Sequence, residues 1–293
     1  MFRLQVTKFG PAILSQLMNI GIRLIVTKQC HSVFGIMDLI HQEKPEHFSL
    51  SQVTSEHHDI ALQVIKEHFL SEHVLVRSRN MDISNDCALD EYLISLLKQG
   101  NSIFARADDG TIAGLCVNFA SSPIDPRNLR NYAFYRQDPN TKDFLYFTAK
   151  LQETPNLWDV FKQKKVYEIK MLTVLPDYRR QGLGVFMAEK SKELAYDQGY
   201  NVIRMDCINP YDYKIAERCM LQCLVKFPLH KVRGANAPFI KRSSEFNRLV
   251  RVYVDARAQP DTDRTTVKNR QQDLESLIEL LGNLFIEIFS DRL

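Results

Sequence analysis

The stretch Leu172-Thr-Val-Leu-Pro-Asp-Tyr-Arg-Arg-Gln-Gly-Leu-Gly184 carries the strongest structural signal in this sequence. The apolar residues over 166–174 predict a strand, and the glycines of the stretch open a helix predicted over 182–198. A further strand is predicted over 201–207. This order of strand, helix and strand predicts a right-handed crossover, which makes the two strands parallel neighbours.

The turn between this strand and this helix is suited to bind an anion. The first turn of a helix leaves backbone N–H groups without intrahelical partners, and the aligned peptide dipoles make that end positive. Gly182 and Gly184 have no side chains that would hold a phosphate away from these amides, and Arg179 and Arg180 add charge and donors. We therefore predict a site for a diphosphate group. The stretch lacks the Gly-Lys-Ser/Thr of a P-loop and the three glycines of a dinucleotide fingerprint.

The remainder of residues 47–255 predicts an α/β domain with a mixed sheet. Periodic patterns predict strands over 47–53, 102–107, 112–120, 221–227 and 249–255, and helices over 55–72, 84–98, 144–151 and 210–220. Asp108, Asp109 and Gly110 predict a turn that joins the second and third strands as a hairpin. Residues 121–136 contain Pro123 and Pro126, so we expect an irregular connection there.

Two segments flank this domain. Residues 1–46 form an N-terminal extension, and its first 37 residues hold four basic side chains and no acid, which is the charge bias of a mitochondrial presequence. Residues 256–293 predict a polar linker and then an amphipathic helix, with apolar residues at three- and four-residue steps from Leu274 to Ile288. We expect this helix to pack on its own domain, with self-association as the alternative.

The composition argues against several classes of protein. The 38 basic and 35 acidic side chains leave a net charge of +3 with no long basic run, which disfavours a nucleic-acid surface. No apolar run reaches the ~18 residues of a membrane-spanning helix. The six cysteines show no CxxC spacing, and no set of His, Cys and carboxylate residues has the spacing of metal ligands. We expect a protein without a metal and with buried thiols, in the cytoplasm, with the mitochondrion as the alternative.

The spacing Arg179-x-x-Gly182-x-Gly184, the strand before it, Pro176 at the strand exit and the region 209–214 resemble the acetyl-CoA signature of the GNAT superfamily of N-acetyltransferases. Over residues 47–255 the order of motifs is similar to that of insect-type arylalkylamine N-acetyltransferases, including dopamine acetyltransferases. The resemblance implies the GNAT fold, acetyl-CoA as co-substrate and a small-molecule primary amine as acceptor, and we expect an arylalkylamine. It also implies that the co-substrate contacts Leu172, Val174, Arg179, Arg180, Gln181, Gly182, Leu183, Gly184, Val185, Asn209 and Lys214.

Two acids compete for the role of general base. In the similar enzymes an acid follows a phenylalanine-rich helix end, and Phe69-Leu-Ser-Glu72 occupies that place, so the resemblance assigns the base to Glu72. Glu168 is the rival, at the position of the catalytic acid in the histone-type branch of the superfamily. It could equally form a surface ion pair with Lys170, because the two share one side of a strand. A base is needed, since an alkylamine with a pKa of ~10 arrives protonated at neutral pH.

The departing thiolate requires an acid, for which Tyr211 and Tyr213 are the candidates. The sequence departs from the family pattern nearby, because His73-Val74 stands where Pro-Leu is usual, and Asp212 occupies the place of a hydroxyl residue. Two alternatives to an acetyltransferase of small amines therefore remain open. One is an acetyltransferase that acts on a peptide or protein amine, and the other is a CoA-binding regulatory module with weakened catalysis.

Overall fold

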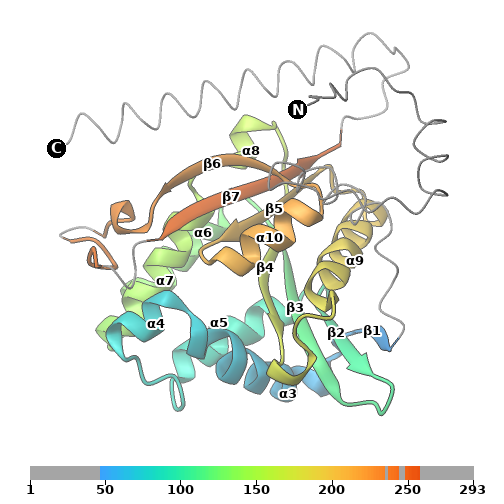
Figure 1. Ribbon diagram of the computed structural model, residues 1–293. Coiled ribbons are helices and arrows are strands. Elements are labelled where there is room, and N and C mark those ends of the chain that lie inside the picture. The colour runs from blue at the N-terminus through green and yellow to red at the C-terminus, as the bar shows by residue number, and fades with distance from the viewer. Residues whose placement is uncertain (1–46, 235–236, 244–247, 258–293) are drawn as a thin grey trace, which may run out of the picture. The chain divides into compact units, whose positions relative to one another are not determined.

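The computed structural model describes residues 47–234, 237–243 and 248–257, which form a mixed sheet with helices on both faces (Figure 1). The expected N-terminal extension and C-terminal amphipathic helix lie outside the described residues. The sheet has seven strands in the order β1-β2-β3-β4-β5-β7-β6. The strands are β1 Phe48–Gln52, β2 Ile103–Ala107, β3 Ile112–Ser121, β4 Val166–Val174, β5 Val202–Cys207, β6 Gln222–Pro228 and β7 Leu249–Ala256. The predicted α/β class with a mixed sheet is confirmed.

The strand connections agree with the prediction in the first part of the sheet. β2 and β3 form an antiparallel hairpin, and the turn contains Gly110 with a φ of 84°, in the left-handed region that favours glycine. β4 and β5 are parallel neighbours joined by helix α9 (Leu183–Asp197), as predicted. The last strand in the sequence, β7, lies between β5 and β6 and pairs antiparallel with both. The edge strand β6 is thus joined to the sheet by a strand that follows it in the sequence.

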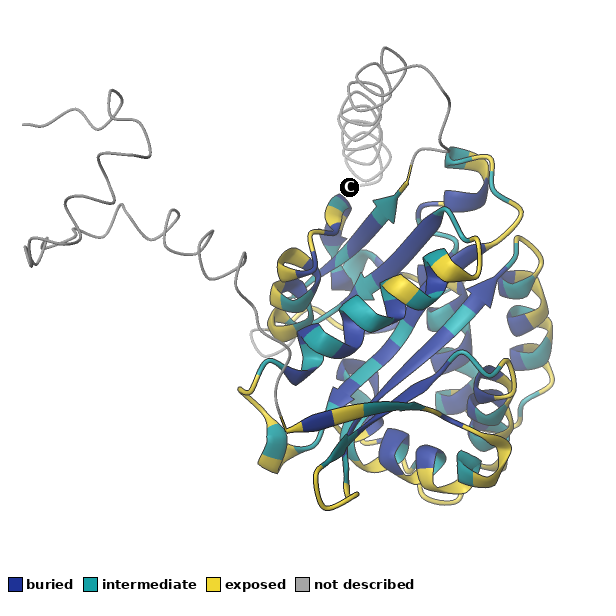
Figure 2. Ribbon diagram, turned by 90° about the vertical axis from the view of Figure 1, so that its right-hand side faces the viewer, coloured by how far each residue is buried: buried dark blue, intermediate teal, exposed yellow. Residues whose placement is uncertain are grey.

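Each face of the sheet has its own apolar core (Figure 2). Helices α9 and α10 (Pro210–Arg218) cover one face, where Tyr167 and Ile169 of β4 are buried. Glu168 and Lys170, which alternate with Tyr167 and Ile169 along β4, point to the opposite face, because side chains alternate along a strand. That face carries η3 Ser55–His57, α3 His58–Val64, η4 Ile65–Phe69, η5 Leu70–Glu72, α4 Val74–Arg79, α5 Cys87–Leu97, α6 Asp125–Phe134, α7 Pro139–Gln152 and α8 Leu157–Val160.

The expectation of an irregular connection over 121–136 is wrong, because helix α6 occupies most of it. Pro126 lies in the first turn of α6, where a missing N–H removes no intrahelical hydrogen bond. Asp125 accepts hydrogen bonds from the backbone N–H and the hydroxyl of Ser122, which fixes the entry into the helix. The proline therefore starts a helix where it was interpreted as a breaker. The short helices α4 and α8 were not predicted either.

The thiols in the described residues are free, and they differ in exposure. Cys116, Cys207 and Cys219 are buried, as expected, whereas Cys87 is exposed at the start of α5. The expectation of buried thiols is therefore wrong for Cys87, which lies in the first turn of a helix with one face toward solvent. Among the helices of the described residues, none combines the length and the apolar character needed to cross a bilayer.

Arg204 of β5 ties the sheet to the C-terminal end of α7. Its side chain is almost fully buried and forms an ion pair with Asp206 at 2.8 Å, and Glu168 lies opposite it in the β4–β5 register. The guanidinium also donates hydrogen bonds of 2.5 to 3.1 Å to the backbone carbonyls of Leu151, Gln152, Thr154 and Pro155. Since the last carbonyls of a helix lack intrahelical partners, this cation stabilises the end of α7.

Replacing Arg204 by Gln is expected to lower the free energy of unfolding by about 3 to 5 kcal/mol, because Asp206 loses its cation and the carbonyls at the end of α7 lose their donors. The measurement is chemical denaturation of the full chain followed by circular dichroism. Arg127→Gln is the control, because Arg127 is exposed on α6 and its loss should change the free energy by less than about 0.5 kcal/mol. Equal losses in the two variants would contradict the role given to Arg204.

Candidate active site

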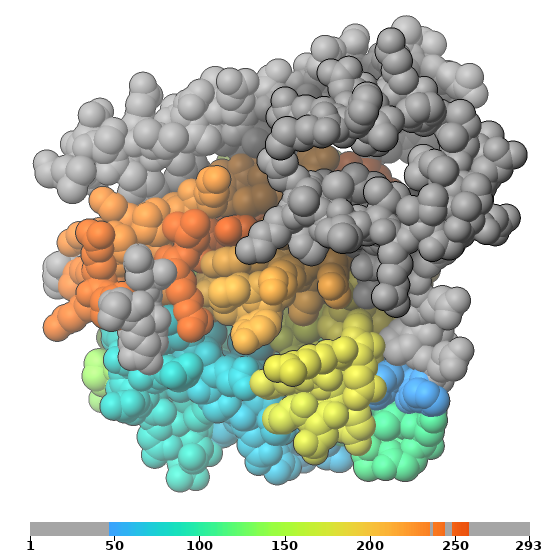
Figure 3. Space-filling model, in the orientation of Figure 1, coloured from blue at the N-terminus to red at the C-terminus, as the bar shows by residue number. Residues whose placement is uncertain are grey.

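A cavity of about 1150 Å³ lies where β4 and β5 separate. The two strands pair only from Tyr167 to Ile169 on β4 and from Ile203 to Met205 on β5, although β4 continues to Val174 with β3 on its other edge. Residues of η4, η5, α4 and α7 and the N-terminal ends of α9 and α10 complete the walls. Figure 3 views the face on which α9 (yellow), α10 (orange) and the segment around α4 (cyan) meet. The divergence of two strands therefore provides the space for a site.

The N-terminal end of α9 lines this cavity without a side-chain cap. Its N-cap is Gly182, with a φ of 78° in the left-handed region. By contrast, side-chain oxygens of Asp86, Asp138 and Asn209 cap α5, α7 and α10. The first-turn N–H groups of α9, at residues 183–185, are therefore left for a ligand, and all three residues line the cavity.

Three cationic residues surround this helix end. Arg179 and Arg180 precede it, Lys214 lies on α10, and all three are exposed and line the cavity. Gln181, which was also predicted as a contact, is exposed but lies outside the cavity wall. Unpaired amides beside several cations match the donors that a diphosphate requires. The residues present thus fit the diphosphate of coenzyme A.

Gly184 lies where α9 packs closely on its neighbours, as well as beside the space for a ligand. A Cβ atom at this position would lie 2.8 Å from Cδ1 of Ile215 on α10 and 3.5 Å from Cδ2 of Leu172 on β4. The absence of a side chain therefore allows three elements to approach one another at the cavity wall. Sequence reasoning had assigned this glycine only to the approach of phosphate.

Two amides of β4 face the cavity from the strand edge. The N–H of Leu175 donates to the carbonyl of Ala113 on β3 at 2.9 Å, and successive N–H groups of a strand point to opposite edges. Leu172 and Val174 therefore direct their N–H groups away from β3, toward the edge that β5 has left. The carbonyl of Val174 at that edge accepts a hydrogen bond of 2.9 Å from Nε of Arg179. These amides are available to an extended acyl chain.

Glu72 lies at the end of η5 and lines the same cavity. The preceding element η4 is a π-helical turn, a feature that is frequent at functional sites. Thr173 of β4 fastens it by donating its hydroxyl to the carbonyl of His68 at 3.2 Å. The Glu72 side chain is 60% exposed, and its Oε1 lies 2.8 Å from Nη2 of Arg179. An ion pair thus joins Glu72 to the turn before α9, a contact that was not predicted from the sequence.

Glu168, the rival base, lies in a buried cluster of charges. Its Oε2 is 2.9 Å from Nζ of Lys170, and its Oε1 accepts a hydrogen bond from Gln152. Burial alone would raise the pKa of Glu168, but the cations of Lys170 and Arg204 outweigh it and hold the pKa below its usual value. The strand alternation places Glu168 and Lys170 on one side as expected, yet the pair is buried rather than at the surface. A carboxylate with a lowered pKa is the weaker base.

The two candidate tyrosines have different surroundings. Tyr211 is exposed and lines the cavity. Tyr213 is buried, its hydroxyl donates to the carbonyl of Leu249, and Arg251 lies over its ring at 4.2 Å. The hydroxyl of Tyr213 is therefore used within the structure, which leaves Tyr211 as the tyrosine on the cavity wall.

Asp212, between these tyrosines, lines the cavity and is hydrogen-bonded to the side chain of Asn209. The pKa of Asp212 is raised to about 7, mainly by burial; the hydrogen bond from Asn209 lowers it in part, and the charge of Glu72 makes a smaller upward contribution. Sequence reasoning noted this residue only as a departure from the family pattern. Its helical position gave no signal of burial, which depends on the opposite wall.

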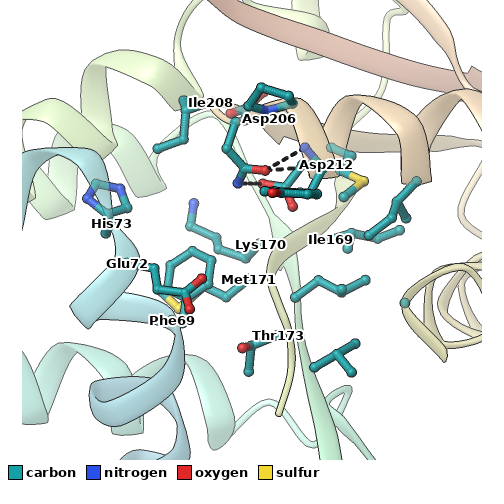
Figure 4. Close-up of a pocket in the computed structure, with 18 of the residues that line it drawn as sticks. Phe69, Glu72, His73, Ile169, Lys170, Met171, Thr173, Asp206, Ile208 and Asp212 are labelled. Carbon is teal, nitrogen blue, oxygen red and sulfur yellow. Dashed lines mark hydrogen bonds between the residues drawn. The ribbon is translucent and has the colours of Figure 1, made fainter. Parts of the chain in front are cut away.

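The half of the cavity away from α9 combines apolar side chains with the charged ones of β4 and β5 (Figure 4). Phe69, Glu72 and His73 lie on one side of the view and Asp212 on the other, with Lys170 and Met171 of β4 between them. The apolar residues of this half include Phe69, Phe144, Phe147, Met171 and Ile208. Aromatic rings of this kind bury an aryl group favourably.

His73 contributes an uncharged ring to this wall. Its Nδ1 accepts a hydrogen bond from the N–H of Leu75 at 3.3 Å, so the proton of the neutral ring is on Nε2. The ring lies edge-on to Phe144 at a centroid distance of 5.2 Å. Burial lowers the pKa of His73 to about 4, so the side chain is neutral at physiological pH. Where the family usually has a proline, this chain therefore has a histidine whose aromatic ring forms part of the cavity wall.

Comparison with known proteins identifies a family and several similar folds. The model of the acetyltransferase (GNAT) family matches residues 65–217. A mosquito arylalkylamine N-acetyltransferase-like protein 5b is 18% identical, with a TM-score of 0.66 over 72% of this chain and 100% of that chain. Arylalkylamine N-acetyltransferase 2 from Aedes aegypti is 21% identical, with a TM-score of 0.64 over 71% and 98%. The Drosophila melanogaster polyamine N-acetyltransferase that forms N-acetylagmatine is 17% identical, with a TM-score of 0.65 over 72% and 100%. At these identities the likeness concerns the fold.

The neutral His73, which is partly buried in the cavity wall, makes the stability of the protein depend on pH. Between its ordinary pKa of 6.5 and its folded pKa of about 4, the unfolded chain binds a proton that the folded chain does not. Stability is therefore lost as the pH falls through this window, by roughly 2.5 kcal/mol between about pH 7.5 and about pH 4.5. His73→Gln, which cannot bind that proton, should remove this part of the loss. Chemical denaturation of the wild type and of His73→Gln at the two pH values measures this loss. If the two proteins differed in unfolding free energy by the same amount at both pH values, the role given to His73 would be contradicted.

Proposed function

The chain belongs to the acetyltransferase (GNAT) family, and on that premise we propose that it transfers the acetyl group of acetyl-CoA to the primary amine of a small arylalkylamine, with Glu72 as general base. The observation that carries the proposal is that one cavity contains both the uncapped end of α9 and the carboxylate of Glu72. A site that holds an acyl donor at one end and an ionised amine at the other needs these two groups.

The hydrogen-bond donors that line the cavity indicate which residues would bind coenzyme A. The amides of residues 183–185, together with Arg180 and Lys214, would hold the diphosphate, and the amides of Leu172 and Val174 would hold the pantetheine arm. The bound co-substrate supplies the activated acetyl thioester. Glu72 lies beside the phosphate-binding turn through its ion pair with Arg179, so the base and the donor site share one framework.

Glu72 suits the role of base because it is accessible to both substrate and water. An alkylammonium with a pKa of ~10 has no free electron pair at neutral pH, and Glu72 would accept its proton before the nitrogen attacks. Its partly exposed carboxylate can then return that proton to solvent. Glu168 is less suited, because it is buried and held by Lys170.

The acceptor half of the cavity favours an arylalkylamine over a polyamine. Phe69, Phe144 and Phe147 offer rings against which an aryl group can pack. The carboxylates of Glu168 and Asp206 at its floor are already paired with Lys170 and Arg204 at 2.9 and 2.8 Å. A second ammonium placed at this floor would have to break one of these buried pairs, which opposes binding of a polyamine there.

The purified full chain with acetyl-CoA is expected to release free thiol in a saturable way when 2-phenylethylamine or tyramine is added. Agmatine and spermidine should show a kcat/KM at least about tenfold lower, because their second cation meets a paired site. Reactions without an amine give the background of thioester hydrolysis. Binding of coenzyme A without thiol release on any amine would contradict the proposal and favour a regulatory module, and turnover only with peptide amines would favour a protein acetyltransferase.

Glu72→Gln should lower kcat/KM by about 10² to 10⁴, most severely at low pH, where almost all of the amine is protonated. The matched control is Glu67→Gln on the preceding turn, whose carboxylate accepts a hydrogen bond from Gln63. Because Glu72 contacts Arg179, calorimetry must show that both variants still bind coenzyme A. An unchanged rate in Glu72→Gln would reject this residue as the base.

A further inference from the structure

We propose that Asp212 is the general acid of the transfer, the group that protonates the sulfur as it leaves the acetyl carbon, an assignment that rests on the proposed function. The position follows from the fold. Asp212 lies in the first turn of α10, which follows β5 on the side where β4 and β5 have separated. It therefore stands beside the β4 edge at which the amides of Leu172 and Val174 are open.

The carboxyl of Asp212 is held so that one oxygen stays free to act. Asn209 accepts hydrogen bonds from the backbone N–H groups of Tyr211 and Asp212, and its amide donates to Oδ2 of Asp212. In the part of the chain that the structure describes, Oδ1 has no hydrogen-bond partner, and the residue lines the cavity. The side chain is thus oriented by a fixed cap and presents an unused oxygen to the ligand.

Glu72 and Asp212 stand on opposite sides of the cavity, one from η5 and one from α10 (Figure 4). The charge of Glu72 disfavours ionisation of Asp212, although burial contributes more to this effect. Asp212 is the more buried of the two, and its pKa of about 7 leaves it partly protonated at neutral pH. The thiol that must be formed has a pKa near that of cysteine, ~8.5, so proton transfer from Asp212 to sulfur is favourable.

The groups that interact electrostatically with Asp212, and the ion-paired groups of the same cavity, do not compete for this role. Glu72, Cys207 and Tyr213 interact with it electrostatically. Burial raises the pKa of the Cys207 thiol, which makes it a poor acid, and the hydroxyl of Tyr213 is donated to Leu249. Lys170, Asp206 and Arg179 line the same cavity and are each held in an ion pair, with Glu168, Arg204 and Glu72 respectively.

The protons balance over one turnover. The ammonium loses its first proton to Glu72, and the nitrogen then forms its bond to the acetyl carbon. As the carbon–sulfur bond breaks, its electron pair stays on sulfur, and Asp212 delivers its proton there. The nitrogen loses its second proton through Glu72, which has meanwhile returned the first to solvent, and Asp212 takes up a proton from solvent. Two protons leave the nitrogen and one is used by the thiol, so the net release is one.

The activity test compares Asp212→Asn with the wild type and with Glu193→Gln, an acid on α9 outside the cavity wall whose carboxylate pairs with Lys190. The wild-type rate should fall as the pH rises above about 7, because Asp212 then loses the proton that it must donate. Asp212→Asn should lower kcat by about 10² to 10⁴ and remove this alkaline decline, while the affinity for coenzyme A stays the same. A variant with the wild-type rate and an unchanged alkaline limb would overturn the assignment.

A second measurement does not depend on turnover. Carboxyl ¹³C NMR of the full chain, with the Asp212 signal identified by its loss in Asp212→Asn, follows the protonation of this group directly. The midpoint should fall in Glu72→Gln, and it should shift on addition of coenzyme A but not of desulfo-coenzyme A, which lacks the thiol. An equal response to the two ligands overturns the placement of Asp212 at the sulfur.

The two measurements also separate this inference from the proposed function. If the wild type acetylates no amine, the proposed function fails, and the NMR comparison still decides whether Asp212 faces the sulfur. If the wild type is active while Asp212→Asn retains both rate and pH profile, the function stands and the general acid is another group.

Discussion

The loss of hydrogen bonds between β4 and β5 beyond Ile169 and Met205 is the constraint on which the site depends. Backbone N–H groups inside a folded protein need partners, so a strand edge abandoned by its neighbour requires a ligand or water. The uncapped end of α9 adds more donors at the same place, and Gly184 lets α9 come close enough to share one wall with β4 and α10. A ligand rich in oxygen acceptors can accept hydrogen bonds from the free N–H groups of both β4 and α9.

The buried charges on the opposite face of the same strands serve a different purpose. Glu168, Lys170, Arg204 and Asp206 carry two charges of each sign, and each cation is paired with a carboxylate of its own strand. Arg204 also supplies the donors at the end of α7, so the helix that bears Phe144 and Phe147 is fixed to the sheet through a polar contact. The floor of the acceptor half is thus electrically balanced, and the aromatic wall above it is held in place.

Much of this architecture could be predicted because its signals are local. The β4–α9–β5 unit and the hairpin through Gly110 follow from neighbouring residues, and the structure agrees with both. The anion site was likewise read from neighbouring residues, and it stays a prediction. The burial of Glu168 depends on Arg204, a residue of another strand, so the pattern along β4 alone could not reveal it. Helix α6 was missed because Pro126 is compatible with both a turn and a first helical turn.

The arrangement of the candidate site was harder to predict than its residues. The placement of Glu72 beside Arg179 joins two segments that are distant in the sequence, and no periodic pattern encodes such a contact. Neighbouring tyrosines on α10 have opposite surroundings because each residue of a helix is rotated by about 100° from the last. The unusual protonation of Asp212 likewise arises from burial against the opposite wall. Tertiary structure, and not composition, determines these properties.

The place of β7 in the sheet affects the order in which the protein is completed during translation. The anchors of α10 come from β7, since Leu249 accepts the hydroxyl of Tyr213 and Arg251 pairs with Glu217. A nascent chain that has released only β1 to β6 from the ribosome therefore has β5 with an open edge and α10 without these anchors. Such an edge is a target for chaperones and for aggregation. The wall that bears Asp212 gains these two contacts only when residues 249–256 emerge.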